Sequence, residues 1–305
     1  MNSSKSKKTN SLLSGVSSLF YAYLALLKPR IKKIFGYPWC VLVGSIIVTG
    51  GYPPLYRTLL TIVSMFAIAT VVYLYNDVVD LEMDRLNPSK KNRPLISGRV
   101  SVKEALIIIY INSIIGILSI LYIGGLTGIL LLAFFILFIS YSHPSIRLKG
   151  RFPLKELTIS MGGILSALIG GTIIGTLSYA VIFFSFIIFG FTYLAMPVFE
   201  DVTDVYEDET YHIKTLAMVL RWRDRVMLFA GFLFTLMIVT PLTWVQLKLN
   251  LLFPIIVVGS SLVLLRYLLP LSAGIEEIKF NKAYKVMYGF WMFIFLAFIL
   301  GSYKF

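Results

Sequence analysis

Long apolar runs alternate with short polar breaks along almost the whole chain. A helix that crosses a bilayer needs about 20 mainly apolar residues, and nine runs approach or exceed this length. They cover residues 20–50, 58–79, 102–121, 123–141, 157–176, 178–198, 227–245, 249–270 and 284–302. The pattern therefore predicts an all-α fold, a polytopic membrane bundle of nine transmembrane helices around a central cavity.

The first run is longer than one crossing requires, and Lys28-Pro29-Arg30-Ile31-Lys32-Lys33 interrupts it. Because proline and charges disfavour a continuous apolar helix, we expect its early part to be kinked or to lie at the membrane interface. Residues 1–18 are polar and basic and lack the apolar core of a signal peptide. We predict a flexible cytoplasmic tail over 1–18 and a single domain over 19–305.

The composition excludes an ordinary soluble protein. Hydrophobic residues make up 58% of the chain and charged residues 14%, whereas a soluble domain carries about 25% charged residues. A formal net charge of +13 could indicate nucleic-acid binding. However, the basic residues lie at the ends of apolar runs and form no stripe. We therefore expect membrane lipids, and no nucleic acid, among the partners.

The distribution of basic residues predicts the orientation in the membrane. If the N-terminus is inside and sides alternate across nine spans, 25 of the 28 Lys and Arg residues fall on the inner side. Only Arg57, Lys248 and Lys304 fall outside. The positive-inside rule requires such a bias. We predict a multi-pass protein of the cell membrane, with the N-terminus and active-site loops cytoplasmic and the C-terminus outside.

Two acidic triplets with the same i, i+3, i+7 spacing follow the second and sixth runs. They are Asp77, Asp80 and Asp84, and Asp201, Asp204 and Asp208. This spacing places each triplet on one helix face, where like charges at a membrane-helix end are costly unless a cation binds them. Mg²⁺ accepts a few carboxylates and completes its shell with water and phosphate oxygens. The two triplets therefore predict a magnesium site that can hold a diphosphate.

Further motifs accompany the triplets. They are Asn76-Asp77-x-x-Asp80-x-x-x-Asp84 with Asn92-Arg93-Pro94, the loop Tyr141-Ser142-His143-Pro144-Ser145-Ile146-Arg147-Leu148-Lys149, Asp201-x-x-Asp204-x-x-x-Asp208 with Ile213-Lys214-Thr215-Leu216, and Leu27-Lys28-Pro29-Arg30. In their order along the chain, and over nearly its whole length, these motifs resemble the signatures of the UbiA superfamily of intramembrane prenyltransferases.

The resemblance implies Mg²⁺-dependent transfer of an isoprenyl group from an allylic diphosphate, with geranylgeranyl diphosphate as the expected donor. Asn76 and the six aspartates would coordinate Mg²⁺, and Arg93, Lys149 and Arg147 would contact the phosphates. Metal ions and fixed cations would stabilise the leaving diphosphate, while an apolar cavity would exclude water. Lys90, by contrast, is interpreted as a topology determinant near lipid headgroups.

The motifs leave more than one class of prenyl acceptor open. Ser97-Gly98-Arg99-Val100-Ser101 and the Ser-x-Pro-x-x-Arg-Leu-Lys loop are similar to archaeal ether-lipid enzymes that act on geranylgeranylglyceryl phosphate, which makes a lipid acceptor our first choice. An aromatic acceptor of the 4-hydroxybenzoate type is the alternative, and a family member that cyclises or hydrates its isoprenoid is a third. A transporter with a carboxylate cation site would be expected to bury its acids near mid-membrane, whereas these acids lie at one face.

Overall fold

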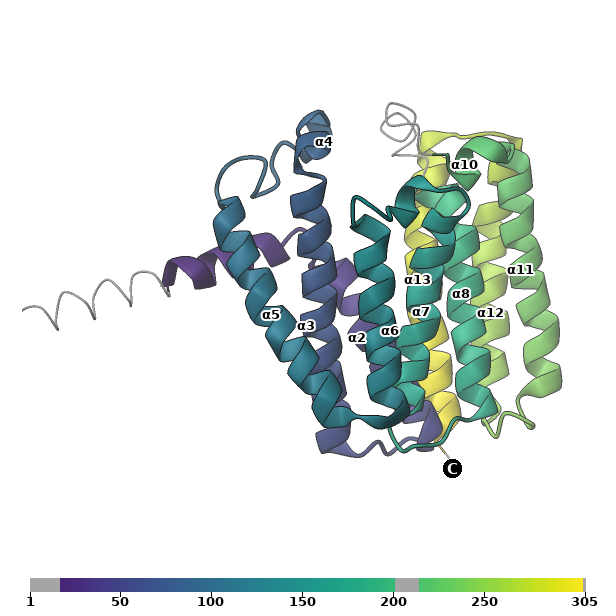
Figure 1. The fold of residues 1–305 in the computed structure, drawn as a ribbon. Coiled ribbons are helices and arrows are strands. Elements are labelled where there is room, and N and C mark those ends of the chain that lie inside the picture. Colours follow the sequence, from purple (N-terminus) through teal and green to yellow (C-terminus); the bar gives the residue numbers. More distant parts are fainter. Residues whose placement is uncertain (1–16, 201–213, 304–305) are drawn as a thin grey trace, which may run out of the picture.

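The computed structural model describes residues 17–200 and 214–303, most of which lie in helices. The long helices are α2 (Ile31–Val48), α3 (Leu55–Val79), α5 (Val102–Ile123), α6 (Gly125–Ser142), α7 (Leu154–Gly171), α8 (Tyr179–Phe199), α11 (Trp222–Thr243), α12 (Leu252–Leu268) and α13 (Glu277–Ser302). Shorter elements are α4 (Leu81–Arg85), α10 (Leu216–Val219) and the 3₁₀ turns η1 (Pro88–Lys90), η2 (Leu148–Gly150) and η3 (Leu269–Ala273). The long helices run side by side, with α4 and α10 at one end of the bundle and the C-terminus at the other (Figure 1).

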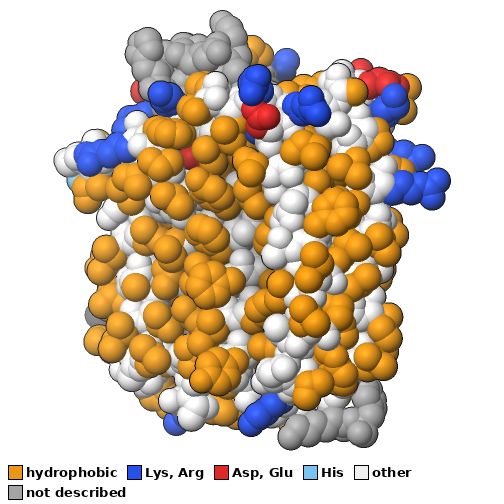
Figure 2. Space-filling model, turned by 90° about the vertical axis from the view of Figure 1, so that its right-hand side faces the viewer, with side chains coloured by type: hydrophobic (Ala, Val, Ile, Leu, Met, Phe, Trp, Pro, Cys, Tyr) orange, Lys and Arg blue, Asp and Glu red, His pale blue; other side chains and the backbone are white. Residues whose placement is uncertain are grey.

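The outer surface of the bundle is strongly apolar. Figure 2 shows hydrophobic side chains over the middle of one face, with Lys and Arg toward its upper and lower ends. Large apolar side chains such as Ile129 and Phe186 are 64% and 62% exposed, which suits contact with lipid tails. Within the described part of the chain, eight helices are long and apolar enough to cross a membrane. The all-α membrane fold is therefore confirmed.

The helix at the span predicted over 157–176 differs from the other long helices. It corresponds to α7, which is not one of the eight helices that qualify by length and hydropathy. This helix starts with Lys155 and Glu156 in its first turn, and it packs against α2, α6 and α8. Because other helices rather than lipid cover much of α7, it does not need the apolar composition of a lipid-exposed span. Eight of the nine predicted spans thus qualify by length and hydropathy, and the ninth, α7, is a long helix that its neighbours largely cover.

The packing of α2 against α7 depends on glycine. A Cβ atom at Gly170 would overlap the carbonyl oxygen of Val41 and lie 2.7 Å from its carbonyl carbon. A Cβ atom at Gly44 would likewise overlap the carbonyl oxygen of Ala167. Small residues let two membrane helices approach backbone to backbone. This contact fixes the relative position of α2 and α7, whose first turns both carry lysines.

The predicted interruption of the first run is confirmed at Lys28-Pro29-Arg30. A short helix over Ser17–Leu27 ends before it, and α2 begins after it at Ile31. Ala22 and Leu26 of the short helix pack in one cluster with residues of α3 and α5. Of the predicted tail, residues 1–16 lie outside the described residues, and the last two begin the short helix. The tail and the single-domain assignment stay predictions.

Candidate active site

A cavity of about 660 Å³ lies among α2, α3, α6, α7, α8 and α13. Acidic and basic side chains, including Asp80 and Lys149, line it where α3 ends. Apolar side chains such as Val72, Phe138 and Ile188 line it further along the helices. The cavity thus joins a charged end to an apolar chamber, an arrangement that suits a ligand with an anionic head and a hydrocarbon tail.

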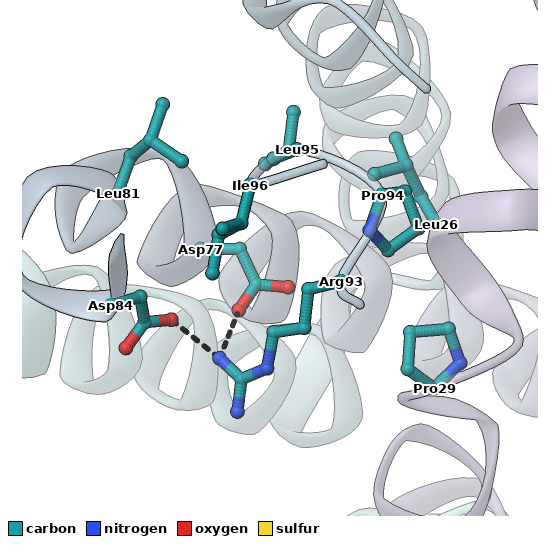
Figure 3. Close-up of a pocket in the computed structure, with 9 residues that line it drawn as sticks. All are labelled: Leu26, Pro29, Asp77, Leu81, Asp84, Arg93, Pro94, Leu95 and Ile96. Carbon is teal, nitrogen blue, oxygen red and sulfur yellow. Dashed lines mark hydrogen bonds and ion pairs between the residues drawn. The ribbon is translucent and has the colours of Figure 1, made fainter. Parts of the chain in front are cut away.

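The first aspartate triplet lies at this charged end. Helix α3 ends at Val79, and after the break the backbone N–H of Asp84 donates to the carbonyl oxygen of Asp80 at 2.7 Å. The helical spacing is therefore kept across the break. Asp80 and Asp84 are buried at 7% and 4% exposure, and Asp77 lies in an adjoining crevice beside Asp84 (Figure 3). The structure brings the three predicted aspartates together.

Three basic side chains, from the loop between α4 and α5 and from the start of α2, pair with Asp77 and Asp84. Arg93 lies between the two carboxylates, in an ion pair with Asp84 and with its Nη1 3.7 Å from Oδ1 of Asp77 (Figure 3). Lys90 Nζ donates to Oδ1 of Asp84 at 2.8 Å, and Arg30 Nε donates to Oδ2 of Asp77 at 3.2 Å. These hydrogen-bonded pairs offset much of the cost of holding the carboxylates away from water.

Asp80 has a separate pair of partners. The Lys149 ammonium and the Asn76 side-chain amide both donate to its carboxylate. Burial lowers the pKa of Lys149, and the charge of Asp80 partly offsets this effect. Arg147, also expected at the phosphates, instead directs Nη2 toward the sulfur of Met83 at 3.8 Å. The structure therefore brings Asn76 and Lys149 to the triplet and gives Arg147 no carboxylate contact among the described residues.

Sequence reasoning did not select Arg30 as a site residue and assigned Lys90 to membrane topology. Burial lowers the pKa of Arg30, but the carboxylate of Asp77 and weaker nearby charges together bring this pKa above its ordinary value. Arg30 directly follows Pro29, where the first apolar run breaks. A charged residue at this break was the sequence feature that could have indicated a site residue. Lys90 reaches Asp84 because the Asn87 side chain accepts from the backbone N–H of Ser89 and starts η1.

The residues present fit a magnesium ion bound together with phosphate. Buried carboxylate oxygens are hard donors, and Mg²⁺ is usually held by one or two carboxylates plus water and substrate phosphates. Among the described residues, no three Asp, Glu, His or Cys side chains form a metal-ligand group by themselves. The second predicted triplet, Asp201, Asp204 and Asp208, lies outside the described residues. Its role as a ligand set stays a prediction.

Glu200, the residue directly before the second predicted triplet, lies at the cavity. Helix α8 ends at Phe199, and the next residue, Glu200, lines the cavity. The Glu200 carboxylate accepts hydrogen bonds from the hydroxyls of Tyr284 and Tyr288 at 3.1 and 3.4 Å. Both tyrosines belong to α13. These contacts hold the C-terminal end of α8 beside the same charged end that contains the first triplet.

Comparison with known proteins agrees with this geometry. A digeranylgeranylglyceryl phosphate synthase from Sulfolobus acidocaldarius is 29% identical over 284 residues, which cover 92% of this chain and 98% of that protein. A solved structure described as digeranylgeranylglyceryl phosphate synthase in membranes superposes with a TM-score of 0.70 at 18% identity, covering 94% of this chain and 99% of that one. A UbiA homologue from Archaeoglobus fulgidus bound to GPP and Mg²⁺ gives 0.64 at 17% identity, with 91% and 99% covered.

The UbiA prenyltransferase family model matches residues 37–294, which include most of the residues that line the cavity. The chain therefore belongs to the UbiA prenyltransferase family and is an intramembrane prenyltransferase.

Proposed function

We propose that this protein transfers a geranylgeranyl group from geranylgeranyl diphosphate to geranylgeranylglyceryl phosphate. The allylic C–O bond to diphosphate breaks, the acceptor hydroxyl oxygen forms an ether bond, and the hydroxyl proton leaves. The cavity carries the proposal, because buried carboxylates and cations lie at one end of an otherwise largely apolar chamber. The match with the Sulfolobus acidocaldarius synthase, which extends over nearly its full length, supports this acceptor over an aromatic one.

The described residues have separate tasks in this reaction. Asp77, Asp80 and Asp84, with Asn76, would hold Mg²⁺, together with the predicted Asp201, Asp204 and Asp208. The metal supplies positive charge to the leaving diphosphate when it is bound. Lys149 and Arg93, already fixed beside the carboxylates, would stabilise the same charge without rearranging. The apolar walls would keep water from the allylic cation.

We also propose that the charged end of the cavity faces the cytoplasm. The positive-inside distribution supports this orientation, and Figure 1 places α4 and the C-terminus at opposite ends of the bundle. Labelling of single cysteines in a Cys40→Ala background tests it in intact cells. Cysteine at Ser89 should be shielded from an impermeant maleimide, and cysteine at Tyr303 should react with it. The reverse result would overturn the orientation.

Product analysis tests the function. Purified protein with geranylgeranyl diphosphate, geranylgeranylglyceryl phosphate and Mg²⁺ should form the diether phosphate and release an equal amount of diphosphate. Mass spectrometry identifies the product, and parallel reactions contain 4-hydroxybenzoate or no acceptor. Transfer to 4-hydroxybenzoate alone would establish the aromatic alternative. A cyclised or hydrated isoprenoid as the main product with either acceptor present would contradict transfer altogether.

Arg93→Gln should lower kcat/KM for the donor by about 100-fold, since it removes a charge-assisted donor aimed at the diphosphate site. Arg99→Gln is the matched control. Arg99 is six residues further on, is exposed, and donates to the backbone oxygen of Asn92 and to the hydroxyl of Ser97. The assay is Mg²⁺-dependent diphosphate release at varied donor concentration. An equal fall in kcat/KM in both variants would show that Arg93 has no specific role at the diphosphate site.

A further inference from the structure

The central cavity ends inside the bundle on all six helices that line it. On each helix, one lining residue lies farthest from the charged end. In the described part of the chain these residues are Cys40 (α2), Val72 (α3), Phe138 (α6), Gly163 (α7), Ile188 (α8) and Trp291 (α13). We call this set the floor of the cavity. Its side chains are largely apolar, so the floor suits the end of a hydrocarbon chain.

The floor lies well below the charged end. Val72 precedes Asp80 by eight residues, and Ile188 precedes Phe199, the last residue of α8, by eleven. An α-helix rises about 1.5 Å per residue, so these steps correspond to about 12 Å and about 16 Å. The apolar part of the cavity is therefore a chamber of limited depth.

The helices are tightly packed one turn beyond the floor. The residues four positions further from the charged end are all buried, and none of them lines the cavity: Gly44, Ile68, Phe134, Ala167, Phe184 and Phe295. The ring centroids of Phe184 and Phe295 lie 5.9 Å apart, and the carbonyl oxygen of Ala167 lies against Gly44. Interiors packed in this way contain few voids larger than a water molecule. A hydrocarbon chain that enters the chamber therefore meets a closed layer.

The volume of the cavity matches one prenyl chain. An apolar cavity of about 150 Å³ holds one benzene molecule, and an isoprene unit is slightly smaller than benzene. The cavity of about 660 Å³ therefore has room for about four such units in all. With its diphosphate at the charged end, one geranylgeranyl chain, which contains four isoprene units, would fill the chamber. The hydrocarbon chain of a lipid acceptor must then stay outside, in contact with the bilayer.

Ile188 occupies the floor between α7 and α8. Its side chain is buried at 1% exposure, and a Cβ atom at Gly163 would lie 2.6 Å from its Cγ2. The Ile188 side chain therefore reaches α7 only because Gly163 has no side chain. Ile187 is buried to a similar degree, at 2% exposure, but is not among the described residues that line the cavity. Two adjacent isoleucines thus differ in whether they face the chamber.

We propose that the floor limits the donor chain to the length of geranylgeranyl, and that Ile188 is the residue that sets this limit. The inference goes beyond the proposed function, on which it rests for the geranylgeranyl donor. A shorter chain leaves part of the chamber unfilled and loses apolar contacts, whereas a chain longer by one isoprene unit must displace the buried layer. A hydrophobic pocket separates ligands that differ by one methylene by about 10–200-fold, so a further isoprene unit should cost at least about tenfold.

The test compares three donors in detergent, with geranylgeranylglyceryl phosphate as acceptor. They are farnesyl, geranylgeranyl and geranylfarnesyl diphosphate, and kcat/KM for each is measured from Mg²⁺-dependent diphosphate release. Ile188→Ala leaves a space in the floor, because the surroundings of a truncated core residue relax only partially. It should raise kcat/KM for geranylfarnesyl relative to geranylgeranyl diphosphate by about tenfold or more. Ile187→Ala removes the same atoms at similar burial and should leave this ratio within about twofold.

A second pair of variants raises the floor. Val72→Met lengthens a side chain that lines the cavity, and Val71→Met makes the same change at a buried neighbour that does not line it. Val72→Met should lower kcat/KM for geranylgeranyl relative to farnesyl diphosphate by about fivefold or more, whereas Val71→Met should leave the ratio within about twofold. Because methionine adapts to irregular space in a core, these proteins should fold, and the test does not depend on Ile188→Ala alone.

An unchanged donor ratio in folded Ile188→Ala or Val72→Met protein would overturn the proposal, since the chain would then leave the cavity sideways into lipid. Equal shifts in the two isoleucine variants, or in the two valine variants, would also overturn it, because they would indicate a general loosening of the bundle.

Failure of the proposed function would look different. If wild-type protein transfers the geranylgeranyl group only to 4-hydroxybenzoate, the acceptor assignment is wrong, while donor ratios measured with that acceptor still test the floor. If it forms the diether and the donor ratios do not shift in the variants, the function stands and the floor is wrong.

Discussion

Asp80→Asn should reduce Mg²⁺-dependent diphosphate release by at least about 100-fold, because it removes a buried carboxylate charge from the proposed metal site. The same change leaves the Lys149 ammonium buried without its counter-charge. Breaking a buried pair in this way destabilises a protein by about 3–5 kcal/mol. The variant should therefore lose both activity and thermal stability. Diphosphate release and thermal unfolding in detergent measure the two losses separately.

A double variant separates the metal role of Asp80 from its structural role. Asp80→Asn/Lys149→Met removes both charges and should recover much of the thermal stability, while diphosphate release stays low. Recovery of both would show that Asp80 is a structural counter-ion and not a metal ligand. Glu82→Gln is the matched control, since the Glu82 side chain is 83% exposed and pairs with Arg85. It should retain activity within about twofold, as expected for an exposed ion pair.

Gly170→Ala should destabilise the bundle by about 3 kcal/mol or more, which lies at the upper end of the usual cost of overpacking. The added Cβ would overlap the backbone of Val41, and a backbone cannot move aside as a flexible side chain can. The two helices must then separate, and the first turns of α2 and α7 would shift with them. Thermal unfolding in detergent should show a clear fall in midpoint, accompanied by reduced activity.

Gly231→Ala provides the comparison for this change. Gly231 lies in α11, and a Cβ atom there meets nothing within 4 Å. Because alanine favours a helix over glycine by about 1 kcal/mol, this variant should keep or slightly raise the unfolding midpoint. Equal midpoints for the two variants would mean that α2 and α7 tolerate a wider spacing than the structure has.

Apolar runs and carboxylate spacing are local properties of a sequence, and they predicted much of the fold. The run at 178–198 became α8, Tyr179–Phe199, and the run at 102–121 became α5, Val102–Ile123. The first triplet was also predictable, because its spacing places the carboxylates on one helix face whatever the surrounding helices do.

Contacts between distant segments could not be predicted in the same way. Arg30 meets Asp77 across 47 positions, and nothing in either local sequence specifies the partner. The enclosure of α7 is likewise a tertiary property, since its run resembles the other runs in the sequence although α2, α6 and α8 cover much of the helix. The role of the second triplet stays a prediction, because this triplet lies outside the described residues. The identity of the acceptor also stays a prediction, because it depends on cavity walls built from six helices.

The enclosure of α7 has a consequence for biogenesis. A helix moves from the translocon into lipid according to its own apolarity. Among the long helices described, α7 is the one that does not qualify as a span by length and hydropathy. Seven residues separate the end of α7 from the start of α8. We therefore expect α7 to be retained during synthesis until α8 can enter the membrane with it as a hairpin. Helix α2, made much earlier, must then accept α7 at the glycine contact. A chain cut before α8 should consequently leave α7 unintegrated and open to proteolysis.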